Sequence, residues 1–318
     1  MKRDRKRRFD PGRLIHVYRK TADNGLLFYD EDDYIVFFTG MCVYARRHNV
    51  DLIAVCLMPD HIHELVSAGR VEDLSAYERD YAAFYAKEMK SCYGTGGQVL
   101  RHRFGSAPKK TEKKCRSAIA YVYNNPVEKY MCRRTLEYRW NFLAYSLHDS
   151  PFSCRPEGRS IALKMAVSLV QRRHEQGKPV NYHMLGKLER LLNTRNHEWM
   201  RDMIIRTYSE IRYDVSVRYF GTMDKMITAI DANTGGEWEM KEEFNESTFK
   251  PFQDMCRIWK TEIGGRPGQT ALDGNSLRKI VKKMVKTGAR NSHIARFLHM
   301  PLKTVDGILG PDYLRFGR

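Results

Sequence analysis

Apolar and polar positions divide the first 150 residues into short strands and longer helices. The expected strand, strand, helix, strand and strand lie at 14–18, 26–29, 30–49, 51–58 and 61–66. The turn sequence Asp23-Asn24-Gly25 predicts that the first two strands form a β-hairpin. Acidic residues at the start of the helix suit a cap near Asp30. Pro59 interrupts the last two strands, which pair with or continue one another.

The pattern continues with a helix at 74–93, a cation-rich strand at 98–104 and a helix at 111–124. Ser75 is a candidate N-cap, Gly94 is expected to end the first helix, and Pro126 to end the second, because proline lacks an amide donor. This order predicts an α+β fold, an antiparallel sheet with its helices on one face. The aromatic segment 138–145 is expected to pack back on the sheet.

The second half of the chain is predominantly helical in pattern. A Pro/Gly/Ser-like stretch at 151–158 predicts a domain boundary. The following residues read as helices, although 212–230 also suits a strand. Segments 276–288, 291–298 and 302–309, with a turn at 299–301, have the spacing of a helix-turn-helix. The expected domains are 1–150, a helical connector or accessory domain at 151–270, and a helix-turn-helix at 271–318.

Charge changes the meaning of that last segment. The chain of 318 residues carries a formal net charge of +17, which favours a polyanionic partner, with nucleic acid ahead of a membrane surface. Residues 275–318 hold ten Lys and Arg against two Asp and Glu, which suits contact with DNA phosphates. A small helical bundle with a solvated basic face is the alternative interpretation.

Composition indicates in which cellular compartment the protein is expected. Hydrophobic residues make up 42% of the chain, but no apolar run is long enough to span a membrane, and no secretory signal follows the basic start. The seven cysteines are scattered, which favours reduced thiols over disulfides or a structural zinc site. We therefore expect a cytoplasmic protein, associated with the bacterial nucleoid, with no membrane partner.

Two short motifs carry the candidate chemistry. His61 and His63 share one face of a strand, whereas Tyr121 and Asn125 lie one turn apart on a helix. Two imidazoles and an amide oxygen can hold Mg²⁺ or Mn²⁺ with positions left open for a phosphate oxygen. Tyr121 would then be the nucleophile. The alternatives are histidines that only hydrogen-bond, a core role for Tyr121, and Tyr123 as a competing nucleophile.

These blocks together resemble a known family. Leu57-Met58-Pro59-Asp60-His61-Ile62-His63-Glu64-Leu65-Val66, Tyr121-Val122-Tyr123-Asn124-Asn125-Pro126-Val127 and Tyr138-Arg139-Trp140-Asn141 resemble the IS200-type Y1 (HUH) transposases. The similarity is greatest to the REP-associated tyrosine transposases and covers roughly residues 10–146. It implies a ferredoxin-like HUH nuclease fold, His61, His63 and Asn125 as metal ligands, and Tyr121 as nucleophile.

The resemblance also implies an activity, although this sequence differs from the family pattern at two positions. Family members cleave single-stranded DNA beside a hairpin through a covalent 5′-phosphotyrosine and transfer the strand by reversing that step. This chain has Asp60 where the family often has Asn, and Tyr123 where it often has His. Asp60 could attract a metal or raise the pKa of His61, and it could also weaken the approach of a phosphate.

Several cations are candidates for DNA contact. They lie before the tyrosine helix and in the helix-turn-helix: Arg101, His102, Arg103, Lys109, Lys110, Arg290 and Lys303. The expected partners are hairpin-bearing single-stranded DNA and flanking duplex, bound by a monomer or homodimer. A regulator with little or no cleavage, or an RNA-hairpin-binding protein, would use the same basic surface, and the intact Tyr121 favours the nuclease over the regulator.

Overall fold

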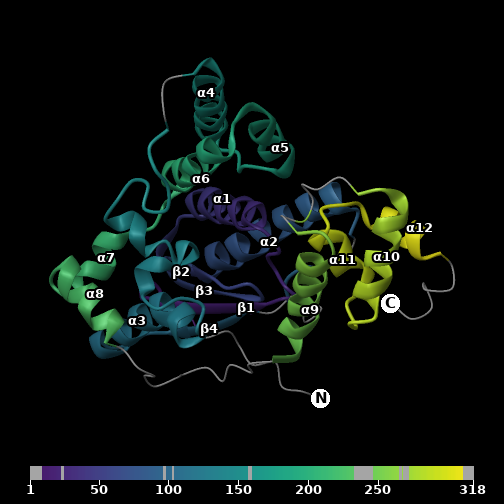
Figure 1. Ribbon diagram of the computed structural model, residues 1–318. Coiled ribbons are helices and arrows are strands. Elements are labelled where there is room, and N and C mark those ends of the chain that lie inside the picture. Colours follow the sequence, from purple (N-terminus) through teal and green to yellow (C-terminus); the bar gives the residue numbers. More distant parts are fainter. Residues whose placement is uncertain are drawn as a thin grey trace.

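The computed structural model describes most of the chain. The described residues are 9–22, 25–95, 98–101, 104–156, 160–232, 246–264, 267 and 272–310. Figure 1 shows a central sheet with helices around it, a group of helices above it, and a C-terminal helical group at its side. No helix in the described part is long and apolar enough to cross a membrane.

The sheet is formed by the first third of the chain. Its elements are β1 (Ile15–Lys20), α1 (Glu31–Arg47), β2 (Val50–Leu57), β3 (His61–Ala68), α2 (Val71–Tyr93) and β4 (Gly105–Pro108). The strands pair antiparallel in the order β2-β3-β1-β4. This β-α-β-β-α-β succession is the ferredoxin-like arrangement. The predicted α+β class with an antiparallel sheet is confirmed.

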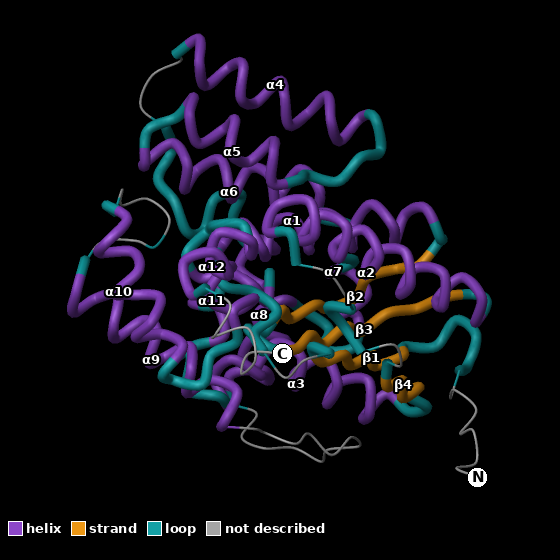
Figure 2. Tube along the Cα trace, turned by 90° about the vertical axis from the view of Figure 1, so that its right-hand side faces the viewer, coloured by secondary structure: helices purple, strands orange, loops and turns teal. Residues whose placement is uncertain are grey.

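Helices cover both faces of the sheet, not one as the sequence predicted. α1 and α2 pack on one face, and α3 (Glu112–Glu128) packs against β2 and β3 on the other (Figure 2). Successive strand residues point to opposite faces. In β3, Glu64 accepts hydrogen bonds from tyrosines of α2, whereas His63 contacts Tyr121 of α3. The helix that carries Tyr121 therefore covers the histidine face.

Local signals explain the elements that were predicted correctly. The Asp30 side chain accepts a hydrogen bond from the Asp33 amide and caps α1, whose first turn is acidic and whose last turn is basic. Thr111 caps α3 in the same way through the Lys114 amide. Gly94 ends α2 in the left-handed conformation that glycine tolerates best.

The predicted hairpin is wrong. Residues 26–29 form no strand, because both edges of β1 are already paired, one with β3 and the other with β4. The segment is instead buried irregular chain, and the amides of Leu27 and Phe28 both donate to the Pro59 carbonyl. The turn residues Asp23 and Asn24 lie outside the described residues.

Three boundaries also differ. The strand predicted at 98–104 lies at 105–108 instead, with Leu100 making only an isolated bridge to Thr21. α2 begins four residues before Ser75, where the extended Arg70 precedes it. α3 continues past Pro126, since the amides that follow still find acceptors. Lys129 donates to the Asn125 carbonyl, and Met131 to the Pro126 carbonyl.

The middle of the chain adds helices to the same core. Three short 3-10 helices, η1 (Thr135–Glu137), η2 (Arg139–Asn141) and η3 (Leu143–Ser146), lead to α4 (Ile161–Glu175), α5 (Tyr182–Leu191), α6 (Thr194–Tyr208), α7 (Tyr213–Arg218) and α8 (Met223–Asp231). Residues 212–230 are thus helical. α5 and α6 pack on α1, and α8 packs on α3. One buried cluster runs from Leu14 to Ile230, across the predicted boundary at 150.

The C-terminal helices enclose a second buried cluster. They are α9 (Glu246–Glu262), α10 (Gly274–Val285), α11 (Asn291–Phe297) and α12 (Leu302–Leu309). α11 and α12 lie where the helix-turn-helix was predicted, and the turn between them contains His299 at φ 54°. α9 packs on α10, so it shares the core of the C-terminal helices. DNA binding by this unit stays a prediction.

Arg296 fastens the C-terminal helices to the sheet domain. From α11 its guanidinium donates to the carbonyls of Leu26 and Leu27 at 3.0 and 2.6 Å and to Asp33 of α1 at 3.1 Å. It also lies 4.3 Å from the centre of the Tyr29 ring. A buried charge needs such partners. The irregular segment 26–29 therefore serves as the docking site of α11.

Candidate active site

The two histidines of β3 lie side by side on the α3 face of the sheet. Their ring centres are 5.0 Å apart, and both side chains are buried. β1 supplies the next strand, and Tyr18, paired with His63 in the register, places its ring 5.0 Å from that of His63. The prediction that these side chains share one face is confirmed, because β3 is regular through both residues.

His63 is the centre of a chain of polar contacts. Its Nε2 lies 3.4 Å from the Tyr121 hydroxyl, and its Nδ1 lies 3.1 Å from Nε2 of His16 on β1. Burial lowers the His63 pKa well below its ordinary value, and the neighbouring His61, His16, Lys129 and Lys20 lower it further. His63 is therefore neutral at neutral pH, with one ring nitrogen available as an acceptor or metal ligand.

Asp60 fixes the orientation of His61. The Nδ1 of His61 lies 2.6 Å from a carboxylate oxygen of Asp60. Burial raises the Asp60 pKa, but the hydrogen bond and charge of His61, together with Lys20, reverse this and lower it overall. The ionised carboxylate can only accept, so Nδ1 donates. In the neutral ring, Nε2 then carries the lone pair. This nitrogen is buried and has no hydrogen-bond partner.

Asn125 supplies a second unsatisfied group. It lies one turn beyond Tyr121 on α3 and is fully buried, and neither amide atom has a hydrogen-bond partner. Buried polar atoms of this kind are rare unless a ligand or ion completes them. No group of three His, Cys, Asp or Glu side chains in the described ranges is arranged to hold a metal. An ion at His61 and His63 would thus need the Asn125 oxygen, which fits Mg²⁺ or Mn²⁺.

The structure adds three residues that the sequence did not single out. His16, Lys20 and Lys129 all lie close enough to His63 to lower its pKa. Lys20 stands opposite His61 in the β1–β3 register, and Lys129 follows the last turn of α3. His16 and Tyr18 alternate along β1 as His61 and His63 do along β3. That alternation is a sequence pattern that could have pointed to His16, whereas no sequence pattern pointed to Lys20 or Lys129.

Tyr123 does not share this site. Its side chain is fully buried, and its hydroxyl donates to the Ile53 carbonyl of β2 at 3.3 Å. Burial raises its pKa well above the ordinary value, so the phenol keeps its proton. Two residues along a helix turn the side chain by about 200°, away from the face of Tyr121.

The predicted DNA-contacting cations do not gather at one place. Arg101 and Lys110 are exposed near β4, whereas Arg290 and Lys303 are exposed on the C-terminal helices. Lys109 is only 5% exposed, so its ammonium is shielded from solvent. Arg103 and His102 lie outside the described residues. Their roles in DNA contact stay predictions.

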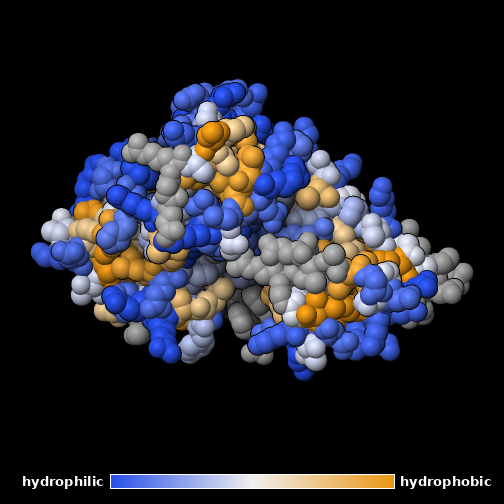
Figure 3. Space-filling model, turned by 45° about the horizontal axis from the view of Figure 1, so that its top comes forward, coloured by the Kyte–Doolittle hydropathy of each residue, from blue (hydrophilic) through white to orange (hydrophobic). Residues whose placement is uncertain are grey.

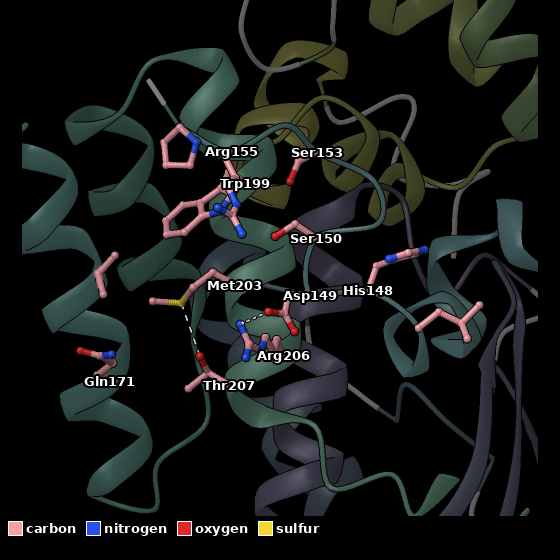
Figure 4. A pocket seen from close by; sticks show the side chains of 13 residues that line it. His148, Asp149, Ser150, Ser153, Arg155, Gln171, Trp199, Met203, Arg206 and Thr207 are labelled. Carbon is pink, nitrogen blue, oxygen red and sulfur yellow. Dashed lines mark hydrogen bonds and ion pairs between the residues drawn. The ribbon is translucent and has the colours of Figure 1, made fainter. Parts of the chain in front are cut away.

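A separate cavity of about 920 Å³ lies between α4, α6 and the segment before α4 (Figure 4). Trp199 and Met203 form part of its lining, and Arg206 in it pairs with Asp149 at 2.7 Å. Figure 3 shows apolar side chains gathered on the side where these helices lie. Ile161 and Met165 of α4 are among the exposed large hydrophobic residues. None of the histidines or tyrosines of the β3–α3 site lines this cavity.

Glu128, the last residue of α3, is a titratable group with a perturbed pKa. One of its carboxylate oxygens is buried without a hydrogen-bond partner. Burial raises its pKa to about 7, although Lys129 and a hydrogen bond with Asn124 act in the opposite direction. Its charged form is therefore disfavoured in the folded protein.

We expect Glu128→Gln to stabilise the protein at pH 8 but not at pH 5. The pKa of Glu128 is higher in the folded protein than in the unfolded chain. The favourable contribution of Glu128 to the free energy of unfolding is therefore fully present below about pH 4.5 and is lost as the pH rises through about 7. Since Glu128 is partly exposed, solvent screening should limit the gain at pH 8 to about 1 kcal/mol. Urea unfolding at both pH values measures it. Glu112→Gln, at the exposed start of α3, should show no gain; equal gains at both pH values would contradict the prediction.

Comparison with known proteins found similarity to a solved structure but not to a family or a curated sequence. No family model and no curated protein sequence matches the chain. A solved structure of a REP-associated tyrosine transposase bound to a REP hairpin is similar at 15% identity and a TM-score of 0.40. The match covers 50% of this chain and 94% of that one. The residue roles below rest on this chain's own geometry.

Proposed function

We propose that this protein is a metal-dependent single-stranded DNA endonuclease and strand transferase that acts beside DNA hairpins. The observation that carries the proposal is the Tyr121 hydroxyl at 3.4 Å from Nε2 of His63, beside two buried groups without partners, Nε2 of His61 and the amide of Asn125. A nucleophile next to an incomplete set of ligands is the arrangement that metal-assisted phosphoryl transfer requires.

His61, His63 and Asn125 would hold Mg²⁺ or Mn²⁺, and the ion would polarise a phosphate oxygen of the substrate. Asp60 accepts a hydrogen bond from Nδ1 of His61, so the lone pair of the ring is on Nε2, where it could bind the ion. Carboxylates hold metal-bound histidines in this way. The Tyr121 hydroxyl lies 3.4 Å from Nε2 of His63, so the nucleophile stands beside the residues that would hold the ion.

Tyr121 then attacks the scissile phosphorus. A bond forms between the phenol oxygen and phosphorus, the bond from phosphorus to the 3′ oxygen breaks, and that oxygen takes up a proton and leaves as a 3′-hydroxyl. The phenol proton passes to solvent, and Lys20 and Lys129, which lie close enough to His63 to lower its pKa, supply positive charge near the site. The protein keeps the 5′-phosphate on Tyr121. Attack by another 3′-hydroxyl reverses the step and joins the strands.

The C-terminal helices fit a duplex-binding role within the same proposal. The outward side of α12 exposes Lys303, Thr304 and Gly307, and Arg290 is exposed at the start of α11. These positions suit contact with phosphates next to a hairpin. Binding of hairpin and duplex without cleavage would make the protein a regulator, and the adduct experiment separates the two functions.

We expect the wild-type protein to form a covalent adduct with labelled single-stranded hairpin DNA when Mg²⁺ or Mn²⁺ is present. Excess chelator should abolish the adduct, because the substrate phosphate is then not polarised. His61→Ala should abolish it too, because one ligand is lost. Denaturing electrophoresis measures the labelled protein band. A band that persists in chelator would contradict the metal requirement, and hairpin binding with no band would favour the regulator.

A further inference from the structure

Tyr130 combines two unfavourable features. Its side chain is 95% exposed, the largest value among the exposed large hydrophobic residues of the described chain. Its backbone has φ 56°, in the left-handed region that bulky residues rarely adopt. Glycine or asparagine is the usual residue at such a helix end. A tyrosine here adds strain without burying its ring, so the fold itself does not explain the choice.

The backbone around Tyr130 is firmly held. The Tyr130 amide donates to the Val127 carbonyl at 3.0 Å, and the flanking amides of Lys129 and Met131 donate to Asn125 and Pro126 at 3.1 and 2.9 Å. The ring is thus fixed at its base and presented to solvent. Strained residues that the surrounding structure holds in place concentrate at functional sites.

The neighbours of Tyr130 are cationic and apolar. Met131 is 41% exposed, and Arg133 and Arg134, three and four residues after Tyr130, are exposed as well. Arg134 lies 3.6 Å from Asp231, which leaves most of its side chain in solvent. Lys129, immediately before Tyr130, is close enough to His63 to lower its pKa. The segment 129–134 therefore extends from the candidate active site along the surface.

The distance from the nucleophile suits a neighbouring nucleotide. Glu128, the last residue of α3, lies about 10 Å from Tyr121 along the helix axis, and Tyr130 follows it by two residues. A single strand whose phosphate is at Tyr121 has its adjacent bases within that range. Unpaired bases expose faces that stack on aromatic rings, while cations beside the ring contact the backbone.

We propose that Tyr130 is a stacking platform for an unpaired base of the single strand next to the cleaved phosphate, with Lys129 and Arg133 contacting the adjacent phosphates. The proposal rests on the proposed function, since it places a nucleic-acid strand at Tyr121. Duplex DNA gains little from this platform, because its bases are already stacked on one another.

The test measures binding without cleavage. In the Tyr121→Phe background, fluorescence anisotropy follows a labelled hairpin with a single-stranded extension. Tyr130→Gly should weaken binding by about tenfold, the loss of one stacked base, and should raise the melting temperature, because glycine relieves the left-handed strain. Tyr130→Phe keeps the ring and should bind like its parent. Ile161→Ala, at a site 78% exposed on α4, is the matched control and should change nothing.

Three results would overturn the platform. These are unchanged affinity in Tyr130→Gly, a tenfold loss in Tyr130→Phe, or an equal loss with blunt duplex DNA. The wild-type adduct is measured separately. If it forms and Tyr130→Gly binds normally, only the platform fails. If neither an adduct nor binding is found, the proposed function fails and the platform with it. A loss confined to Tyr130→Gly on the single-stranded substrate supports the proposal.

Discussion

Tyr121→Phe is expected to abolish the covalent adduct with single-stranded hairpin DNA while leaving binding of the hairpin intact. The substitution removes only the hydroxyl, which contacts His63 at 3.4 Å. The ring remains, and its contacts with His16 and His63 are preserved. Without the phenol oxygen no bond to phosphorus can form, so the loss should be complete. Electrophoresis of the adduct and anisotropy of the bound DNA measure the two effects.

Tyr123→Phe is the matched variant. Its hydroxyl donates to the Ile53 carbonyl inside the core, so its removal should cost about 1 kcal/mol of stability and leave the adduct in place. An adduct that survives in Tyr121→Phe and disappears in Tyr123→Phe would show that the nucleophile is the other tyrosine. Loss in both variants with normal folding would show that the adduct depends on both hydroxyls.

Arg296→Ala is expected to destabilise the protein by about 3 to 5 kcal/mol, the usual cost of breaking a buried ion pair from one side. The guanidinium is buried, and Asp33 and the carbonyls of Leu26 and Leu27 would each lose the hydrogen bond that it donates. Burial alone would lower the Arg296 pKa, but Asp33 and nearby tyrosines raise it overall, which keeps the charge in place. Urea unfolding measures the loss, and it should be accompanied by separation of the C-terminal helices from the sheet domain.

Two variants control this prediction. Arg290→Ala removes an exposed arginine at the start of the same helix and should cost less than about 0.5 kcal/mol. Arg296→Lys keeps a charge but cannot reach all three acceptors with one ammonium, so it should fall between wild type and alanine. Stability in Arg296→Ala within error of Arg290→Ala would show that the C-terminal helices are held by their apolar contacts alone.

The sequence predicted those features that depend on neighbours along the chain. α1 and its Asp30 cap, the β2–β3 pair and the start of α3 at Thr111 follow from residues that lie close together along the chain. The shared face of His61 and His63 follows from the two-residue period of a strand, and the turn between Tyr121 and Asn125 from the period of a helix. The α+β class followed from the order of these elements.

Tertiary structure decided which segments of the chain pair or pack with one another. Residues 26–29 have the pattern of a strand, but β1 had no free edge for them, and they became the docking site of Arg296. Residues 105–108 pair with β1 at four positions, whereas Leu100 makes only an isolated bridge to Thr21 just beyond that strand, a difference that local propensity does not contain. Pro126 removes one donor, yet packing of α3 on the sheet held the helix together beyond it.

The site divides in the same way. The sequence by itself indicated the candidate side chains, because the types of ligand and nucleophile are set by residue identity and spacing. Only the tertiary structure decided that Asp60 orients His61 and that His16 contacts His63. It also placed two lysines beside the histidines and turned Tyr123 into the core. Apart from the Asp60–His61 pair, these relations join residues dozens of positions apart, and burial and charge between them arise only when the sheet and α3 pack together.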